Sequence, residues 1–533
     1  MKATYILKSS CIFDSIGNSP TPGALVICGN KIEGLLSQDE LNSFDAGDAV
    51  VVDCGDKLIM PGFIDSHMHA GANMDYVDES YCVDVSPATS FEGVIKIIEE
   101  YGAKHPNNKF LLGINFNLFN LEKRIIPTAK LIDSYISDRP VIIHTWDCHT
   151  FFTNSKGIEL SGIKKDDPDP NHACGRDENG DLTGEFNDSA SFILSKKITR
   201  TFAERQGSLR NFMAKLNACG ITSFADMFPS GDEETYPLFK SLEDELTTRI
   251  HFFSSLMDFS PELVKSYRET YNSKMLQFSG LKCLMDGVLT VFTAWMLKPY
   301  SNNRSTCGFP ALDKDKVKEK IFQACKSGIN VRVHTIGDAA VKYILDVFED
   351  AQKMYGNLEK RHCMEHIEYI NPADIPRFAE LGIVADMHPR HLMFYIDDAI
   401  EYLGEEREKY TWVFRELLKT GALIGTGSDF PVVNFNPMLG IYTGVTRAKD
   451  NGMPEGGWHP EQKLMMHEIL KMYTIGSACA INRDKELGTL EKGKLADVVV
   501  LDRNLFEIDA KEILQVKPVL TMMDGEIVYK DGM

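Results

Sequence analysis

The sequence predicts an α/β protein: a (β/α)8 TIM barrel with a small β-sandwich domain built from both termini and a subdomain inserted after the first barrel strand. Three observations predict this fold. Short apolar segments alternate with segments of helix length through the middle of the chain. Both ends are rich in β-branched runs that turn residues separate. Histidine, lysine and aspartate stand at the ends of several apolar segments, where a barrel collects its functional side chains.

The two ends of the chain have the same strand-rich texture, and we assign residues 1–58 and 485–533 to the β-sandwich domain. A hairpin turn is predicted at Asp524-Gly525. The strand candidates, separated mainly by glycine and proline, are residues 5–7, 24–28, 49–52, 496–501, 519–523 and 526–529.

The middle of the chain, residues 59–484, is assigned to the barrel. The segments between its strand candidates, for example 315–326 and 339–354, are long enough for helices. Residues 75–205 interrupt the alternation with strand candidates of their own, so we assign them to the inserted subdomain. The eight barrel-strand candidates are residues 61–69, 221–227, 249–253, 281–287, 329–334, 361–366, 383–388 and 423–429.

The composition and net charge of the chain restrict the kinds of molecule that we expect it to bind. The 533 residues carry a formal net charge of -20, which argues against nucleic-acid and anionic-membrane partners because both demand clustered lysine and arginine. No signal-peptide pattern is visible, and no apolar run approaches the ~20 residues that span a bilayer. The twelve cysteines form no Cys-x-x-Cys pair and are expected to be reduced. We therefore expect a cytoplasmic protein that acts on a small-molecule substrate, and a homo-oligomer stays open.

The first barrel-strand candidate ends in His-x-His. His67 and His69 are two residues apart on a strand, so their side chains share a face and can converge on one metal ion. An isolated His-x-His is more often a pair of solvated loop residues. Here, however, six ligand-type residues stand at five of the eight strand ends, which favours a metal centre: His67, His69, Lys282, His334, His366 and Asp429.

The motifs that contain these residues run nearly from end to end of the chain. They are residues 61–69, Asp147-Cys148-His149, Lys282 with Asp286-Gly287, His334-Thr335-Ile336-Gly337-Asp338, Glu365-His366, Gly427-Ser428-Asp429-Phe430-Pro431 and residues 488–497. This set resembles the amidohydrolase superfamily, and in particular amidohydrolase family 3, which includes YtcJ-like hydrolases and N-substituted formamide deformylases.

The resemblance implies two divalent metal ions per chain. Zinc suits a histidine-rich site, although iron, manganese or cobalt would fit similar ligands. A free ammonium is a poor neighbour for two cations, whereas a carbamate formed with carbon dioxide offers two anionic oxygens. If the lysine instead only reaches solvent, the site holds one metal. The implied ligands are His67, His69 and Asp429 for one ion, His334 and His366 for the other, and carboxylated Lys282 as the bridge.

The resemblance also implies catalytic and substrate-binding residues. Asp429 would take a proton from a metal-activated water and pass it to the leaving nitrogen. His149 or a metal would polarise the substrate carbonyl, and a structural role for His149 is equally open. Asp286 is expected at the substrate. His388-Pro389 stands where the family commonly carries Gln-Pro, so His388 is either a substrate contact or an additional ligand.

The function favoured by these motifs is hydrolysis of a non-peptide carbon–nitrogen bond of the amide type: an amide, a formamide or a cyclic amide. The alternative is a heterocycle deaminase of the same superfamily. Deaminases typically carry a glutamate shortly after the fifth-strand histidine, where this chain has Gly337, and that favours the amide hydrolase. A non-catalytic binding or regulatory protein would be expected to have a broken metal set, which this sequence does not have.

Overall fold

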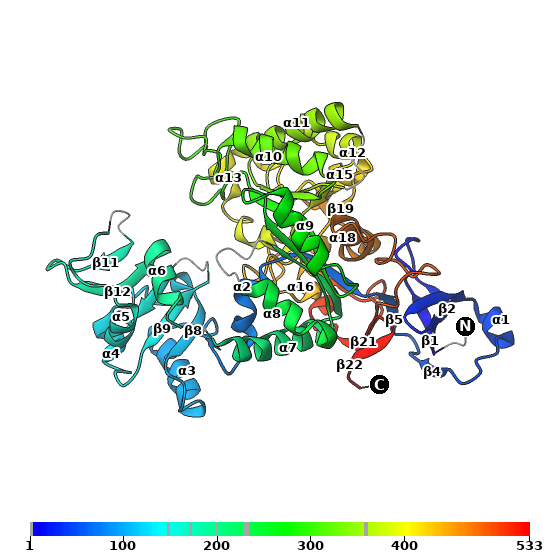
Figure 1. The fold of residues 1–533 in the computed structure, drawn as a ribbon, viewed down its shortest axis with the longest axis horizontal. Coiled ribbons are helices and arrows are strands. Elements are labelled where there is room, and N and C mark those ends of the chain that lie inside the picture. Colours follow the sequence, from blue (N-terminus) through cyan, green and yellow to red (C-terminus); the bar gives the residue numbers. More distant parts are fainter. Residues whose placement is uncertain are drawn as a thin grey trace. The chain divides into compact units, whose positions relative to one another are not determined.

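The chain forms two compact units, which are described separately below (Figure 1). The computed structural model describes residues 4–146, 150–169, 173–198, 200–227, 234–356 and 361–532. The first unit joins the residues up to Ala72 with those from Met213 onward, and the second unit is Asn73–Phe212. Among the described residues, no helix combines the length and apolar character that crossing a membrane requires.

The first unit contains a TIM barrel of eight strands, and every pair of neighbours is parallel. Backbone hydrogen bonds between its first and last segments, from Asp429 N to His67 O (2.7 Å) and from His69 N to Phe430 O (2.8 Å), nearly close the ring. The predicted fold class is confirmed, and each of the eight strand candidates overlaps one barrel strand. In chain order they are β6 (Phe63–Met68), β13 (Ile221–Met227), β14 (Arg249–Ser255), β15 (Leu276–Leu284), β16 (Val331–Thr335), β17 (Cys363–His366), β18 (Val384–Asp386) and β19 (Ile424–Gly425).

Helices follow the barrel strands, and α11 (Asp338–Tyr355) shows why they form where they do. Its buried residues include Val341, Ile344, Leu345 and Phe348, whose spacing of three and four residues places them on one face. Figure 1 shows α10 and α12 beside it. The other helices of eight or more residues in this unit are α9 (Pro261–Thr270), α10 (Lys314–Lys326) and α16 (Pro437–Thr446); shorter ones include α8 (Thr235–Ser241), α12 (Arg377–Leu381), α15 (Phe414–Lys419) and α17 (Met466–Lys471).

Strands from both ends of the chain form a second sheet in the same unit. β20 pairs antiparallel with β5, so a C-terminal strand lies next to the strand that leads into the barrel. Leu7, Ile59, Val498 and Leu520 are buried together in its core. The order is β22 (Glu526–Lys530), β21 (Pro518–Met523), β20 (Val498–Leu501), β5 (Leu58–Pro61), β1 (Tyr5–Ile12), β2 (Thr21–Cys28) and β3 (Lys31–Leu36), with β4 (Val50–Asp53) paired to β1.

The second unit is built around a sheet of its own. Successive residues of β9 belong to two different apolar clusters, since Val141 and Ile143 pack in one and Ile142 in the other. This alternation means that both faces of the sheet are covered. The strand order is β11 (Cys174–Arg176), β12 (Leu182–Asn187), β10 (Thr150–Thr153), β9 (Val141–Thr145), β8 (Leu111–Phe116) and β7 (Val83–Asp84), and the longest helix wholly inside the unit is α3 (Phe91–Lys104).

Candidate metal centre

The predicted ligands lie at the carboxyl ends of the barrel strands, as a TIM barrel requires. His67 is in β6 and His69 directly follows it, while Asp429 lies beyond β19. Both imidazoles meet the same carboxylate oxygen: Asp429 Oδ1 is 3.3 Å from His67 Nε2 and 3.2 Å from His69 Nε2. The backbone bonds that nearly close the barrel join these same residues, so closure of the barrel also positions them.

The hydrogen bond that His69 Nδ1 makes determines which ring nitrogen faces Asp429. His69 Nδ1 lies 2.8 Å from the backbone oxygen of Met227. A carbonyl oxygen can only accept, so Nδ1 carries a proton, and Nε2 is the nitrogen that faces Asp429 and is placed to bind a metal ion. Without an ion, burial would lower the pKa of His69, but the hydrogen bond and the charge of Asp429 outweigh it and raise that pKa. Burial would raise the pKa of Asp429, but the His67 and His69 imidazoles outweigh it and hold that pKa well below its usual range. The group is thus an anionic oxygen with two nitrogen donors.

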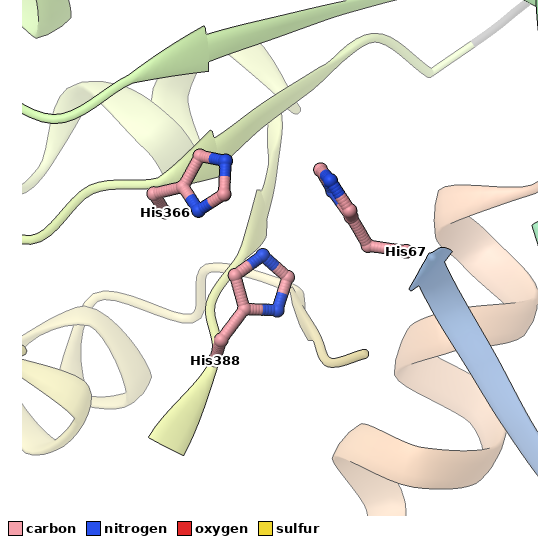
Figure 2. Close-up of side chains that lie close together, drawn as sticks. All are labelled: His67, His366 and His388. Atoms are coloured by element: carbon pink, nitrogen blue, oxygen red, sulfur yellow. The ribbon is translucent and has the colours of Figure 1, made fainter. Parts of the chain in front are cut away.

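A second group consists of three buried imidazoles, His67, His366 and His388 (Figure 2). The ring centroid of His388 lies 4.9 Å from that of His67 and 4.8 Å from that of His366. Burial lowers the pKa of His388 to about 4 and that of His366 well below its usual value, so both rings are neutral at pH 7. Neutral imidazole is the form that binds metal ions.

His334 lies next to this group, with its ring centroid 4.3 Å from that of His366. Among the described residues, four groups of three or more ligand atoms meet within 4.8 Å, and His334 belongs to none of them. Its Nε2 is 3.4 Å from the backbone oxygen of Gly287.

Lys282 is buried and forms an ion pair with Glu365. Burial, followed by the charge of Arg332, lowers the pKa of Lys282 to about 7. Arg332 Nε donates to Glu365 Oε1 (2.7 Å), and its guanidinium also pairs with Asp386. Lys282, Arg332 and two carboxylates therefore form a buried network, in which Glu365 Oε1 also lies 3.2 Å from His67 Nδ1.

Asp286 and His149 are the two predicted site residues that remain to be located. Asp286 is fully buried, and its carboxylate accepts hydrogen bonds from the backbone N–H groups of Ile336 (2.9 Å), Gly337 (2.8 Å) and Trp295 (2.9 Å). These bonds hold the turn between β16 and α11, and the expected substrate contact stays a prediction. His149 lies outside the described residues.

The sequence reasoning missed His391 and Glu368. His391 Nε2 is 3.8 Å from Asp429 Oδ2, and His391 Nδ1 is 3.7 Å from Glu368 Oε1. Pro389 begins a 3-10 helix (Pro389–Phe394) that repeats every three residues, which turns His391 toward the site together with His388. The signal was therefore the His-Pro-x-His spacing, in which only the first histidine was considered.

The chemistry of these side chains fits a divalent metal ion. Among the described residues, the buried ligand-type atoms at this site that have no hydrogen-bond partner include His366 Nδ1, His388 Nε2, His391 Nε2 and Asp429 Oδ1. Leaving a polar atom buried without a partner costs about 1–3 kcal/mol. A cation bound between them would satisfy nitrogen lone pairs and carboxylate oxygen alike, whereas water could not serve so many acceptors.

Comparison with known proteins gives the same result. Residues 50–529 match the model of the amidohydrolase family. The chain is 26% identical to the putative amidohydrolase YtcJ of Bacillus subtilis, over 99% of this chain and 100% of that protein. It is also 26% identical to the N-substituted formamide deformylase of Arthrobacter pascens, over 95% of each chain.

A solved structure shares the fold. An uncharacterized metal-dependent hydrolase from Pyrococcus horikoshii superposes with a TM-score of 0.77 at 24% identity, over 95% of this chain and 99% of that one. The family match covers nearly the whole chain, and the barrel brings the expected donor side chains together. The chain belongs to the amidohydrolase family and is a hydrolase that acts on carbon–nitrogen bonds.

Proposed function

We propose that the enzyme hydrolyses a non-peptide amide-type bond of a small molecule, in an amide, a formamide or a cyclic amide. The observation that carries this proposal is the convergence of His67 Nε2 and His69 Nε2 on Asp429 Oδ1. A divalent ion held there would supply Lewis acidity, which lowers the pKa of water from about 15.7 to about 7 and polarises a carbonyl group. The similarity to a formamide deformylase supports an N-formyl or N-acyl substrate.

Asp429 is proposed as the group that moves the proton. Its Oδ1 faces the two imidazoles, while Oδ2 faces His391 at 3.8 Å. One oxygen can therefore act as a ligand while the other accepts the proton of the nucleophilic water and delivers it to the leaving nitrogen. His391 lies beside the oxygen that would hold the proton, and Glu368 lies on the far side of that ring. His149 or a metal ion is proposed to polarise the substrate carbonyl.

Lys282 is proposed as a carboxylated bridge between two zinc ions, the first held by His67, His69 and Asp429 and the second by His334 and His366. Carbamate formation requires a neutral amine, and the lowered pKa of Lys282 supplies that form near pH 7. The ion pair of Lys282 with Glu365 competes with this chemistry, and Arg332 is in place to retain Glu365 once the amine has reacted.

The first experiment measures metal per chain by elemental analysis, on protein purified with bicarbonate and without chelators. We expect close to two equivalents, falling in Lys282→Ala. Lys494→Ala is the matched control, because Lys494 is also buried but donates to the backbone oxygens of Asp484 (2.7 Å) and Leu487 (3.2 Å). One equivalent that Lys282→Ala leaves unchanged would remove the bridge, and metal-free protein would refute the proposed function.

Substrate class is tested on the metal-loaded enzyme with N-formyl and N-acyl amines. Release of formate or another carboxylate together with the amine is the expected result. Release of ammonia from amino-substituted heterocycles, without turnover of the amides, would favour the deaminase instead.

A further inference from the structure

We propose that His388 is an additional metal ligand, which with His67 and His366 gives the barrel centre a site of three imidazoles. The inference rests on the proposed metal-dependent function and changes the ligand sets proposed above, because it assigns His67 and His366 to the same ion. It also selects between the two roles left open by the sequence, a substrate contact and a ligand.

The hydrogen bonding of His388 leaves one nitrogen available. His388 Nδ1 lies 2.9 Å from the backbone oxygen of Gly427. Because that oxygen only accepts, Nδ1 carries the proton and Nε2 presents a bare lone pair. Nε2 is buried and has no hydrogen-bond partner in the part of the chain that the structure describes. His69 has the same arrangement, with Nδ1 on the backbone oxygen of Met227 and Nε2 facing Asp429.

The same backbone segment orients both His388 and Asp429. Gly427 lies two residues before Asp429, in the stretch that follows β19, while His388 follows β18. A Cβ at Gly427 would lie 2.6 Å from Asp65 Oδ1 and closer still to the backbone nitrogen of His67. The segment is therefore packed tightly against β6. Backbone carbonyls that hold the protonated nitrogen of a metal-binding histidine are the usual outer support of such a site.

Three features favour a ligand over a substrate contact. The His388 ring is fully buried, so it presents no surface to a substrate that approaches from solvent. Figure 2 shows the rings of His67, His366 and His388 facing a common space. Their ligand atoms lie within 4.8 Å of one another. Neutral imidazoles whose lone pairs point toward one another repel one another, whereas each lone pair is attracted to a cation bound between them.

An additional imidazole has a consequence for metal choice. Nitrogen donors favour zinc, cobalt, nickel and copper, whereas magnesium and manganese favour oxygen donors. A site with His388 as ligand should therefore bind cobalt(II) and zinc(II) strongly and discriminate against manganese(II). Replacing His388 by glutamine should weaken that discrimination, since the amide offers a neutral oxygen in place of the nitrogen.

The test compares His388→Gln with a matched control, His251→Gln. His251 is also a buried barrel histidine whose Nε2 has no hydrogen-bond partner among the described residues, but its Nδ1 contacts Ser279 Oγ (3.0 Å). It belongs to none of the ligand groups that the described residues form. Metal-depleted full-length proteins are titrated with cobalt(II) against a chromophoric chelator, and the visible d–d absorption of bound cobalt is recorded. Circular dichroism verifies the fold, and His388→Asn serves as a second variant.

The loss of an outer-shell partner of a metal site typically weakens metal binding by about 10–100-fold, so we expect His388→Gln, which removes a ligand, to weaken cobalt binding at least that much and to change the d–d absorption. His251→Gln should bind cobalt like the wild type. Unchanged affinity and spectrum in His388→Gln, with metal bound by the wild type, would overturn the inference and leave the proposed function intact. An equal loss in His251→Gln would overturn it too, since the effect would then follow from a lost buried histidine. A wild type that binds no metal would remove both proposals.

Discussion

The buried guanidinium of Arg249 ties the barrel to the sheet formed by the chain ends. Arg249 starts β14 and is fully buried. It binds both oxygens of Asp497, from Nε and from Nη2 at 2.9 Å each, and Nη2 also reaches Asp524 Oδ1 at 3.0 Å. The pairing is bidentate and charged, the geometry in which arginine binds carboxylates most strongly.

Arg249→Met removes the cation and leaves two carboxylates in a region with little water. Asp497 is only 6% exposed and Asp524 15%. Lys274 still pairs with Asp524 in this variant, so Asp497 is the carboxylate that loses its cation. Breaking a buried pair by removing one partner costs about 3–5 kcal/mol, because the remaining charge stays buried without compensation. The exposed pair of Lys318 and Asp350, at 2.8 Å with side chains 40% and 46% exposed, is the matched control. Lys318→Met should cost about 0–1 kcal/mol.

The assay is urea unfolding of the full-length protein, followed by far-ultraviolet circular dichroism and by tryptophan fluorescence, to which the buried Trp412 of this unit contributes. A second comparison adds Asp497→Asn to Arg249→Met, and we expect the double variant to lose less than the sum of the single losses. If the free energy of unfolding of Arg249→Met lies within about 1 kcal/mol of that of Lys318→Met, the ion pair does not stabilise the contact between barrel and sheet, and the reasoning is refuted.

Three further outcomes are expected. Asp429→Asn keeps the side-chain shape but loses the base, so kcat should fall by about 10²–10⁴-fold on the substrate found in the screen, and unchanged kcat would contradict its role. Burial would raise the pKa of Asp524, but Lys274 and Arg249 outweigh it and hold that pKa below its ordinary 3.8. The unfolded chain then binds more protons, so the stability that this carboxylate provides is complete well above pH 3.8 and is lost as the pH falls below it. In Asp524→Asn, the urea midpoint should therefore depend less steeply on pH below 3.8 than it does in the wild type. A slope equal to that of the wild type would contradict this. Gly427→Ala should cost about 1–3 kcal/mol and lower the metal content, because its Cβ would meet Asp65 Oδ1 at 2.6 Å. Gly207→Ala, whose Cβ meets nothing within 4 Å, should show neither loss.

The barrel was predictable from the sequence because local pattern encodes it. Parallel strands are buried on both faces and therefore appear as short apolar runs, as in β13, where all seven residues are buried. Ligand-type residues at the ends of these runs then mark one rim. The terminal sheet was visible for the same reason, since its strands are short apolar or β-branched runs separated by turns.

What the sequence did not predict depends on contacts between distant residues. The network of Lys282, Glu365 and Arg332 joins three strands, and no local pattern shows that a glutamate and an arginine next to predicted ligands face inward. His391 was missed because its position depends on one turn of 3-10 helix after Pro389. The backbone role of Asp286 was hidden as well, because three N–H groups of other segments determine it.

The order of strands in the terminal sheet has a consequence for biosynthesis. β5 is made early, yet its partner β20 leaves the ribosome only after residues 62–497 have been translated, which takes roughly 20–90 seconds at about 5–20 residues per second. For that time the edge of β5, whose residues are all buried in the finished fold, has no strand to pair with. The nascent chain thus carries an open apolar edge of the kind that chaperones cover. Premature termination before Val498 would make this transient state permanent.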